Sequence, residues 1–149
     1  MPNWCSNEVQ FDGSEEDITK FKEECFTDHK GVAVLDFSKV LPEPDYDKPK
    51  KDGTHNNGVQ TELSSAMPDW WNWRNNNWGT KWNLVPNHDG DLSSYDADVE
   101  KDYINLTFDT AWSPPNGIYE AIVDKYPDLS INWFYREDGV QIAGWLPYD

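Results

Sequence analysis

The tryptophan-rich segment 70–83 (WWNWRNNNWGTKWN) constrains the fold more than any other part of the sequence, because it holds five of the nine tryptophans. Tryptophan is a large apolar side chain with one N–H donor, so such a cluster must either enter the core or bind a partner. Large and polar side chains alternate from Trp78 to Leu84, which predicts a strand that buries Trp78 and Trp82 on one face. The asparagines at 75–77 predict a turn before this strand.

The first three tryptophans of the segment precede that turn, so they belong to another element, and two interpretations stay open. In one, they end a helix or cover a sheet edge. In the other, they form a surface that recognises a partner or a ligand, together with two cations: Trp70, Trp71, Trp73, Arg74 and Lys81. We expect Lys81 to have an acidic neighbour such as Asp109, because an unpaired cation amid partly buried tryptophans would be costly.

The 149 residues are predicted to form one domain, 1–149, which is long enough to bury a core. The formal net charge is −16, with a pI near 4.3. Direct binding to nucleic acid is not expected, because phosphate contacts need clustered lysines and arginines, and binding to an anionic membrane is disfavoured for the same reason. No long apolar run or secretion signal stands out, so we expect a cytoplasmic protein.

The cysteines and histidines do not predict a metal site or a cofactor. Cys5 and Cys25 have no metal-binding or redox spacing, and two thiols cannot hold an iron–sulfur cluster. We expect both thiols to be reduced and buried, although a strand followed by an antiparallel helix leaves a bridge between them open. The histidines at 29, 55 and 88 are too isolated to indicate a metal triad or a catalytic base, and no catalytic residue is predicted.

Apolar periodicity, turn residues and helix caps predict an α+β fold. Besides the strand at 78–84, the expected strands are 5–11, 32–37, 103–109, 129–135 and 140–146, the last two joined as a hairpin. Ser14 is expected to cap a helix that runs to about Thr27, Ser113 a second helix that runs to Pro127, and a short helix is expected at 60–66. The proline- and glycine-rich region before that short helix predicts a long loop.

The segment Pro86–Asp102 is strongly acidic and is predicted to be a solvated loop between two strands. Its glycine and acid spacing does not fit a calcium-binding EF-hand loop. Because the scaffold fixes both ends, its carboxylates are candidates for binding a basic protein partner: Asp89, Asp91, Asp96, Asp98, Glu100 and Asp102.

Four blocks of sequence, taken together, resemble the YubB/Api-like ferredoxin-like family carried by phages and conjugative plasmids. They are Met1–Asn7 (MPNWCSN), Trp78–Trp82 (WGTKW), Phe108–Pro115 (FDTAWSPP) and a closing hairpin at Gly139–Gly144. The resemblance implies a ferredoxin-like antiparallel sheet with helices on one face, to which long loops and extra strands are added. It also implies a mobile-element origin and a bacterial host cytoplasm, and it supplies no catalytic residues.

Three functions stay open at this point. The first is a non-enzymatic interaction protein that binds and inhibits a basic host protein, such as a nucleic-acid-binding defence factor, by acting as a DNA mimic. The second is a small-ligand-binding protein or enzyme whose Trp-rich pocket gathers Asn7, Arg74, Lys81 and Asp109. The third is a structural module of a larger assembly.

Overall fold

The computed structural model describes residues 3–46, 68–86 and 94–147. These residues form seven strands and four helices in chain order. The strands are β1 (Trp4–Asp12), β2 (Phe26–His29), β3 (Val32–Leu35), β4 (Asp96–Val99), β5 (Tyr103–Ala111), β6 (Ser130–Glu137) and β7 (Ile142–Trp145). The helices are α1 (Glu15–Cys25), α2 (Phe37–Val40), α3 (Asp69–Asn77) and α4 (Asn116–Lys125).

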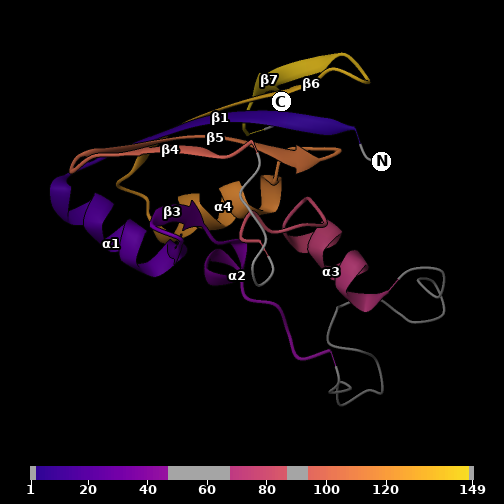
Figure 1. Cartoon of the computed structure of the whole chain (residues 1–149), viewed down its shortest axis with the longest axis horizontal. Coiled ribbons are helices and arrows are strands. Elements are labelled where there is room, and N and C mark those ends of the chain that lie inside the picture. Colours follow the sequence, from indigo (N-terminus) through magenta and orange to yellow (C-terminus); the bar gives the residue numbers. More distant parts are fainter. Residues whose placement is uncertain (1–2, 47–67, 87–93, 148–149) are drawn as a thin grey trace.

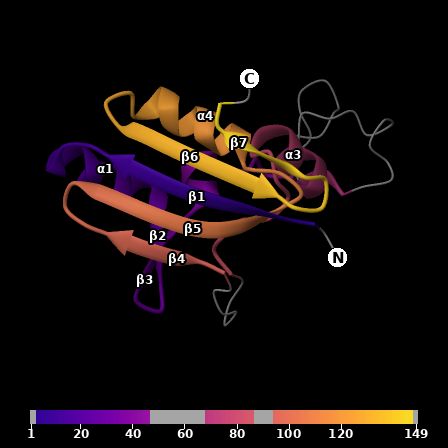
Figure 2. The same cartoon turned by 90° about the horizontal axis from the view of Figure 1, so that it is seen from above.

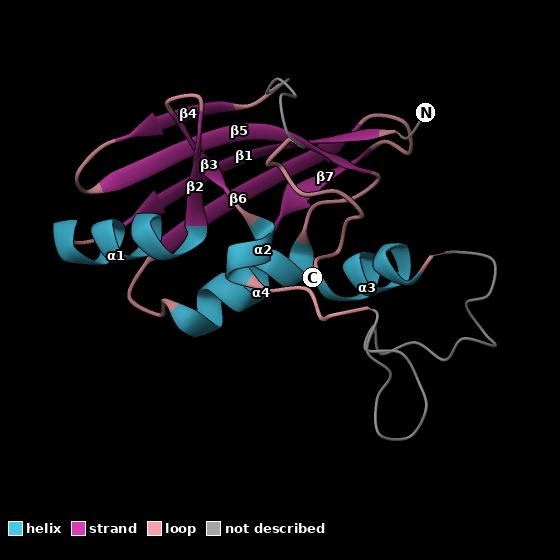
Figure 3. Ribbon diagram, turned by 60° about the horizontal axis from the view of Figure 1, so that its bottom comes forward, coloured by secondary structure: helices cyan, strands magenta, loops and turns pink. Residues whose placement is uncertain are grey.

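Five strands form one antiparallel sheet in the order β4-β5-β1-β6-β7, and the helices lie against one of its faces (Figures 1 and 3). Its skeleton is the β-α-β-β-α-β series β1-α1-β4-β5-α4-β6. The β2–β3 hairpin, α2 and α3 are inserted between α1 and β4, and β7 is added at the end. The other face of the sheet carries no helix in the part of the chain that the structure describes (Figure 1).

The alternating side chains of β1 explain why one face is covered. Cys5, Val9 and Phe11 are buried toward the helices, whereas Glu8 and Gln10 are exposed on the opposite face. Burying the apolar half of such a strand requires a second layer. The helices supply that layer through aromatic packing, since Phe21 of α1 lies 4.7 Å from Phe11 between ring centroids.

The predicted helix caps were right for one helix and two residues early for the other. The Ser14 side chain accepts a hydrogen bond from the Asp17 amide, as expected of an N-cap. The second helix begins at Asn116, because the Ser113 hydroxyl donates to the Gly79 carbonyl (2.7 Å) and so does not cap it.

The predicted strand from Trp78 to Leu84 was wrong. The asparagines before it continue α3 to Asn77, and the following residues form an irregular segment. Gly79 there has a positive φ of 90°, a dihedral that interrupts an extended strand. Trp78 is fully buried as predicted, but Trp82 is 40% exposed, so its predicted burial was wrong as well.

Other elements complete the comparison. The strands predicted around β1, β3, β5, β6 and β7 are present, and the last two pair as the expected hairpin. The first helix ends at Cys25 because Phe26 starts β2, which the sequence did not predict.

Both cysteines are buried and free, and burial raises the pKa of the Cys5 thiol to about 11. The short helix expected at 60–66 lies outside the described residues.

Candidate interaction surface

The helix-free face of the sheet, called the open face below, is acidic. Strand alternation and register place five carboxylates on it: Glu8, Asp12, Asp96, Asp98 and Asp109. Among the described strand residues of this face, the only cation is Arg136, whose Nε lies 3.1 Å from an oxygen of Asp138. Figure 2 looks onto the sheet from above and shows how its strands lie side by side. The face therefore has a negative field that a basic partner would complement.

The strand register orders this face into rows across the sheet. One row runs Asp96, Thr107, Glu8, Phe134 and Trp145, from β4 to β7. The next runs Asp98, Asn105, Gln10 and Asn132. Directly opposed side chains on adjacent strands are close enough to interact. The first row thus joins two carboxylates, on β4 and β1, to an aromatic pair on β6 and β7, while the second row joins one carboxylate to three amides.

A groove of about 560 Å³ follows these two rows. Its lining includes one carboxylate, three side-chain amides and two aromatic rings. The lining residues are Glu8, Val9, Gln10, Asn105, Leu106, Thr107, Asn132, Phe134 and Trp145. The Asn105 Oδ1 atom is covered and has no hydrogen-bond partner within the described residues. The Glu8 carboxylate only accepts hydrogen bonds, and each side-chain amide adds one acceptor oxygen beside its own N–H donors, so the groove can receive a ligand that carries N–H donors.

The groove ends at an exposed tryptophan. Trp145 is 62% exposed, and its ring centroid lies 5.0 Å from that of Phe134. Cations lie over the rings of Trp70, Trp78, Trp82 and Tyr126, but none lies over Trp145 in the described parts of the chain.

The predicted acidic segment contributes only part of the open face. Asp96 and Asp98 lie on strand β4, so this portion is an edge strand and not the expected loop. Glu100 and Asp102 follow β4 and are exposed at the turn into β5, while Asp89 and Asp91 lie outside the described residues. Sequence reasoning missed Glu8, Asp12, Phe134 and Trp145 as members of this face. The sequence could have placed Glu8 on this face, because it occupies a polar position between two buried positions of β1.

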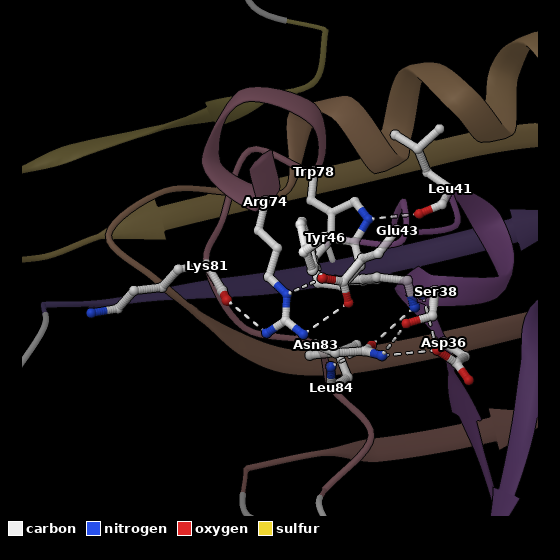
Figure 4. Close-up of polar contacts among 11 residues, drawn as sticks. Asp36, Ser38, Leu41, Glu43, Tyr46, Arg74, Trp78, Lys81, Asn83 and Leu84 are labelled. Carbon is white, nitrogen blue, oxygen red and sulfur yellow. Dashed lines mark hydrogen bonds and ion pairs between the residues drawn. The ribbon is translucent and has the colours of Figure 1, made fainter. Parts of the chain in front are cut away.

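The predicted aromatic and basic residues lie elsewhere, on and after α3. Trp70, Trp71 and Trp73 are all in this helix, of which Trp73 is buried. The Arg74 side chain bonds both oxygens of Glu43 at 3.0 and 2.8 Å and donates to the Lys81 carbonyl at 3.2 Å (Figure 4). Its guanidinium also lies over the Trp70 and Trp78 rings, at 5.3 and 4.8 Å from their centroids. These contacts hold three chain segments together.

The neighbours of Arg74 extend this intramolecular network. The Tyr46 hydroxyl donates to Glu43, and its burial, together with that bond, raises the pKa of the phenol. The Trp78 indole donates to the Leu41 carbonyl at 2.9 Å (Figure 4). Asn83 accepts from the Phe37 amide at 2.9 Å, so it fixes the start of α2.

Lys81 does not form the expected ion pair with Asp109. Its ammonium lies 4.4 Å from the centroid of the Trp82 ring, and the ion pairs among described residues do not include it. The Asp109 carboxylate instead accepts from the Ser6 hydroxyl at 3.3 Å, on the open face. Asn7 points to the opposite side of the sheet, where it is fully buried and accepts from the Trp133 indole at 3.0 Å. The structure therefore places Asn7 and Asp109 on opposite faces of the sheet, not in one pocket.

Three of the four sequence blocks of the family resemblance, Met1–Asn7, Trp78–Trp82 and Phe108–Pro115, are joined by hydrogen bonds. The Thr80 hydroxyl donates to the Ala111 carbonyl at 3.1 Å, and the Gly117 amide donates to the Trp78 carbonyl at 3.0 Å. The Trp112 amide donates to the Asn3 carbonyl at 2.8 Å. These bonds connect the segment after α3 and the start of α4 with the ends of β1 and β5.

Comparison with known proteins agrees with this architecture. Residues 79–149, just under half of the chain, match the family model described as a ferredoxin-like domain in Api92-like protein. The fold is ferredoxin-like. The four strands of its β-α-β-β-α-β skeleton are ordered β6-β1-β5-β4 in the ferredoxin-like sheet, and β7 is added at one edge. No curated protein and no solved structure matches the chain.

Two further observations concern the described part of the ferredoxin-like chain. It contains no group of three or more cysteine, histidine or carboxylate side chains placed to hold a metal ion. None of its helices combines the length and the apolar character needed to cross a membrane.

Proposed function

We propose that this is a non-enzymatic interaction protein whose acidic open face binds a basic protein partner. The observation that carries the proposal is the face itself: its described strand residues include five carboxylates and one paired guanidinium, and none of the described helices covers it. Strands fix the spacing of these charges, and complementary fields accelerate association and select partners of opposite charge.

The proposed partner is a host protein that normally binds nucleic acid, including a defence factor, and the proposed effect is inhibition by occupation of its basic groove. Adjacent strands are separated by about 4.8 Å, so carboxylates two strands apart, such as Glu8 and Asp96, are separated by roughly 10 Å across the face. Fixed negative charges at such spacings can substitute for phosphates. The proposal includes an origin in a phage or conjugative plasmid and action in the bacterial cytoplasm.

The test uses a variant in which the open face is neutralised and a control with the same change in net charge on the helix layer. The open-face variant is Glu8→Gln, Asp12→Asn, Asp96→Asn and Asp98→Asn. The control is Glu16→Gln, Glu23→Gln, Asp124→Asn and Asp128→Asn, all of which are exposed.

Each protein is used to capture bacterial lysate proteins at low and high salt, and the captured proteins are assayed for release of labelled duplex DNA. We expect the parent and the control to retain basic proteins at low salt and to displace their DNA, because they share the open face. The open-face variant should lose both activities. Equal capture and equal displacement by the two variants would show that bulk charge, and not this face, drives the interaction.

A further inference from the structure

We propose that the groove beside Trp145 is an arginine-recognition site that selects arginine over lysine in the basic partner. This inference rests on the proposed function and specifies which basic side chain the open face recognises. A row of fixed carboxylates attracts either cation, so the selectivity must come from the remaining chemistry of the groove.

The aromatic pair supplies a surface on which a planar cation can stack. Trp145 is 62% exposed, and the Phe134 ring lies 5.0 Å away at a tilt of 56°. Guanidinium is planar and weakly hydrated, whereas the lysine ammonium is compact and strongly hydrated. Arginine therefore gains more than lysine from lying against these rings.

Hydrogen-bond acceptors lie beside the aromatic pair. Glu8 is opposite Phe134 in the register, so its exposed carboxylate adjoins the aromatic pair. A carboxylate can accept two parallel N–H bonds from one guanidinium. Asn132 precedes Phe134 by two residues on the same strand face and adds an amide oxygen in the next row. The groove therefore offers a stacking surface and acceptors within the reach of one side chain.

A second groove with exposed aromatic rings is less suited to an external cation. It includes Trp82, whose ring already has the Lys81 ammonium 4.4 Å from its centroid and Trp4 at 5.8 Å between centroids. A partner would have to displace the chain's own cation there. The Trp145 ring has no such occupant among the described residues.

The test compares two hexapeptides that alternate glycine with arginine or with lysine, titrated into each protein by calorimetry at low salt. Their charges are equal, so a difference in affinity reports the cation and not the field. We expect the parent protein to bind the arginine peptide roughly three- to tenfold more tightly than the lysine peptide. Trp145→Leu should bring the ratio close to one, while Trp82→Leu should leave it unchanged.

A second pair of variants tests the carboxylate without altering the aromatic rings. Glu8→Gln and Asp12→Asn each remove one charge from the open face, but only Glu8 lines the groove. We expect Glu8→Gln to weaken binding of the arginine peptide several-fold more than Asp12→Asn does. Equal affinities of the parent for both peptides, or an unchanged ratio in a folded Trp145→Leu protein, would overturn the inference while leaving the proposed function intact. Failure of both peptides to bind would overturn the two together.

Discussion

Trp78 and Trp82 are close in sequence but have different environments. The Trp78 ring is fully buried, packs edge-on against Phe37 and Trp73, and donates to the Leu41 carbonyl. Trp82 is 40% exposed and contacts Trp4 and the Lys81 ammonium. The first tryptophan therefore contributes to the core, whereas the second covers the end of the sheet.

This difference predicts unequal effects of truncation. Trp78→Ala should lower the free energy of unfolding by about 3–5 kcal/mol, because it leaves a cavity and an unpaired carbonyl. Trp82→Ala should lower it by only about 1 kcal/mol, since much of its surface already faces water. Chemical denaturation of the two variants checks the order. A larger loss for Trp82 would mean that the exposed ring is more important to the fold than its contacts indicate.

Side-chain chemistry at single residues also explains why the predicted turn was wrong. Asparagine is expected in turns because it bonds nearby backbone groups. In α3, however, the Asn75 and Asn77 amides donate to the carbonyls four residues earlier, those of Trp71 and Trp73, at 2.8 Å each. Those bonds are compatible with a helix, and the burial of Trp73 and Trp78 stabilises it. The turn propensity of asparagine is a local property, so it could not predict that burial of these tryptophans would stabilise the helix.

At the scale of elements, the joint between α3 and α4 depends on a glycine. A Cβ atom at Gly117 would lie 1.7 Å from the Asn77 carbonyl oxygen, which is a backbone atom and cannot move without shifting α3. The Gly117 amide also donates to the Trp78 carbonyl at 3.0 Å. The close approach of the two helices thus requires the absence of a side chain at this position.

We predict that Gly117→Ala lowers the free energy of unfolding by about 3 kcal/mol or more. Alanine has a higher helix propensity by about 1 kcal/mol, which is too little to offset the clash. Gly144→Ala serves as the control, because its methyl would lie 3.3 Å from the hydroxyl of Tyr135, a side-chain end that can shift. Thermal unfolding of both variants gives the comparison, and a stabilised Gly117→Ala protein would contradict the geometry.

The elements that were predictable are those whose signals are local. Alternation identified β1 and β5, and Ser14 with three following acids identified α1. The acidic residues of the open face were predictable only in part. Charge density pointed to Asp96 and Asp98, but Glu8 and Trp145 join them through the pairing of strands distant in sequence. Strand order is a long-range property that periodicity does not encode, so the groove could not be inferred from the sequence.

At the scale of the whole molecule, the net charge of −16 opposes folding, because compaction brings like charges together. We predict that raising NaCl from about 20 to about 500 mM increases the melting temperature, since the screening length falls to a few ångströms. The control variant of the helix layer has four fewer negative charges. Its melting temperature should therefore be higher at low salt and should rise less when salt is added. Calorimetric scans of both proteins at the two salt concentrations decide this, and equal gains would argue against self-repulsion.

The two edges of the sheet differ in how they would receive another strand. An unpaired edge can form hydrogen bonds with a foreign strand, and charged side chains discourage such pairing. β4 has Asp96 and Asp98 at its edge, whereas β7 has the sequence IAGW, without a charge and with Ile142 46% exposed. A strand that approaches β4 meets fixed negative charge, while one that approaches β7 meets an uncharged backbone. Among the described residues, the β7 edge therefore has less protection by charge against such pairing than the β4 edge, and a strand added there would lie beside the Trp145 groove.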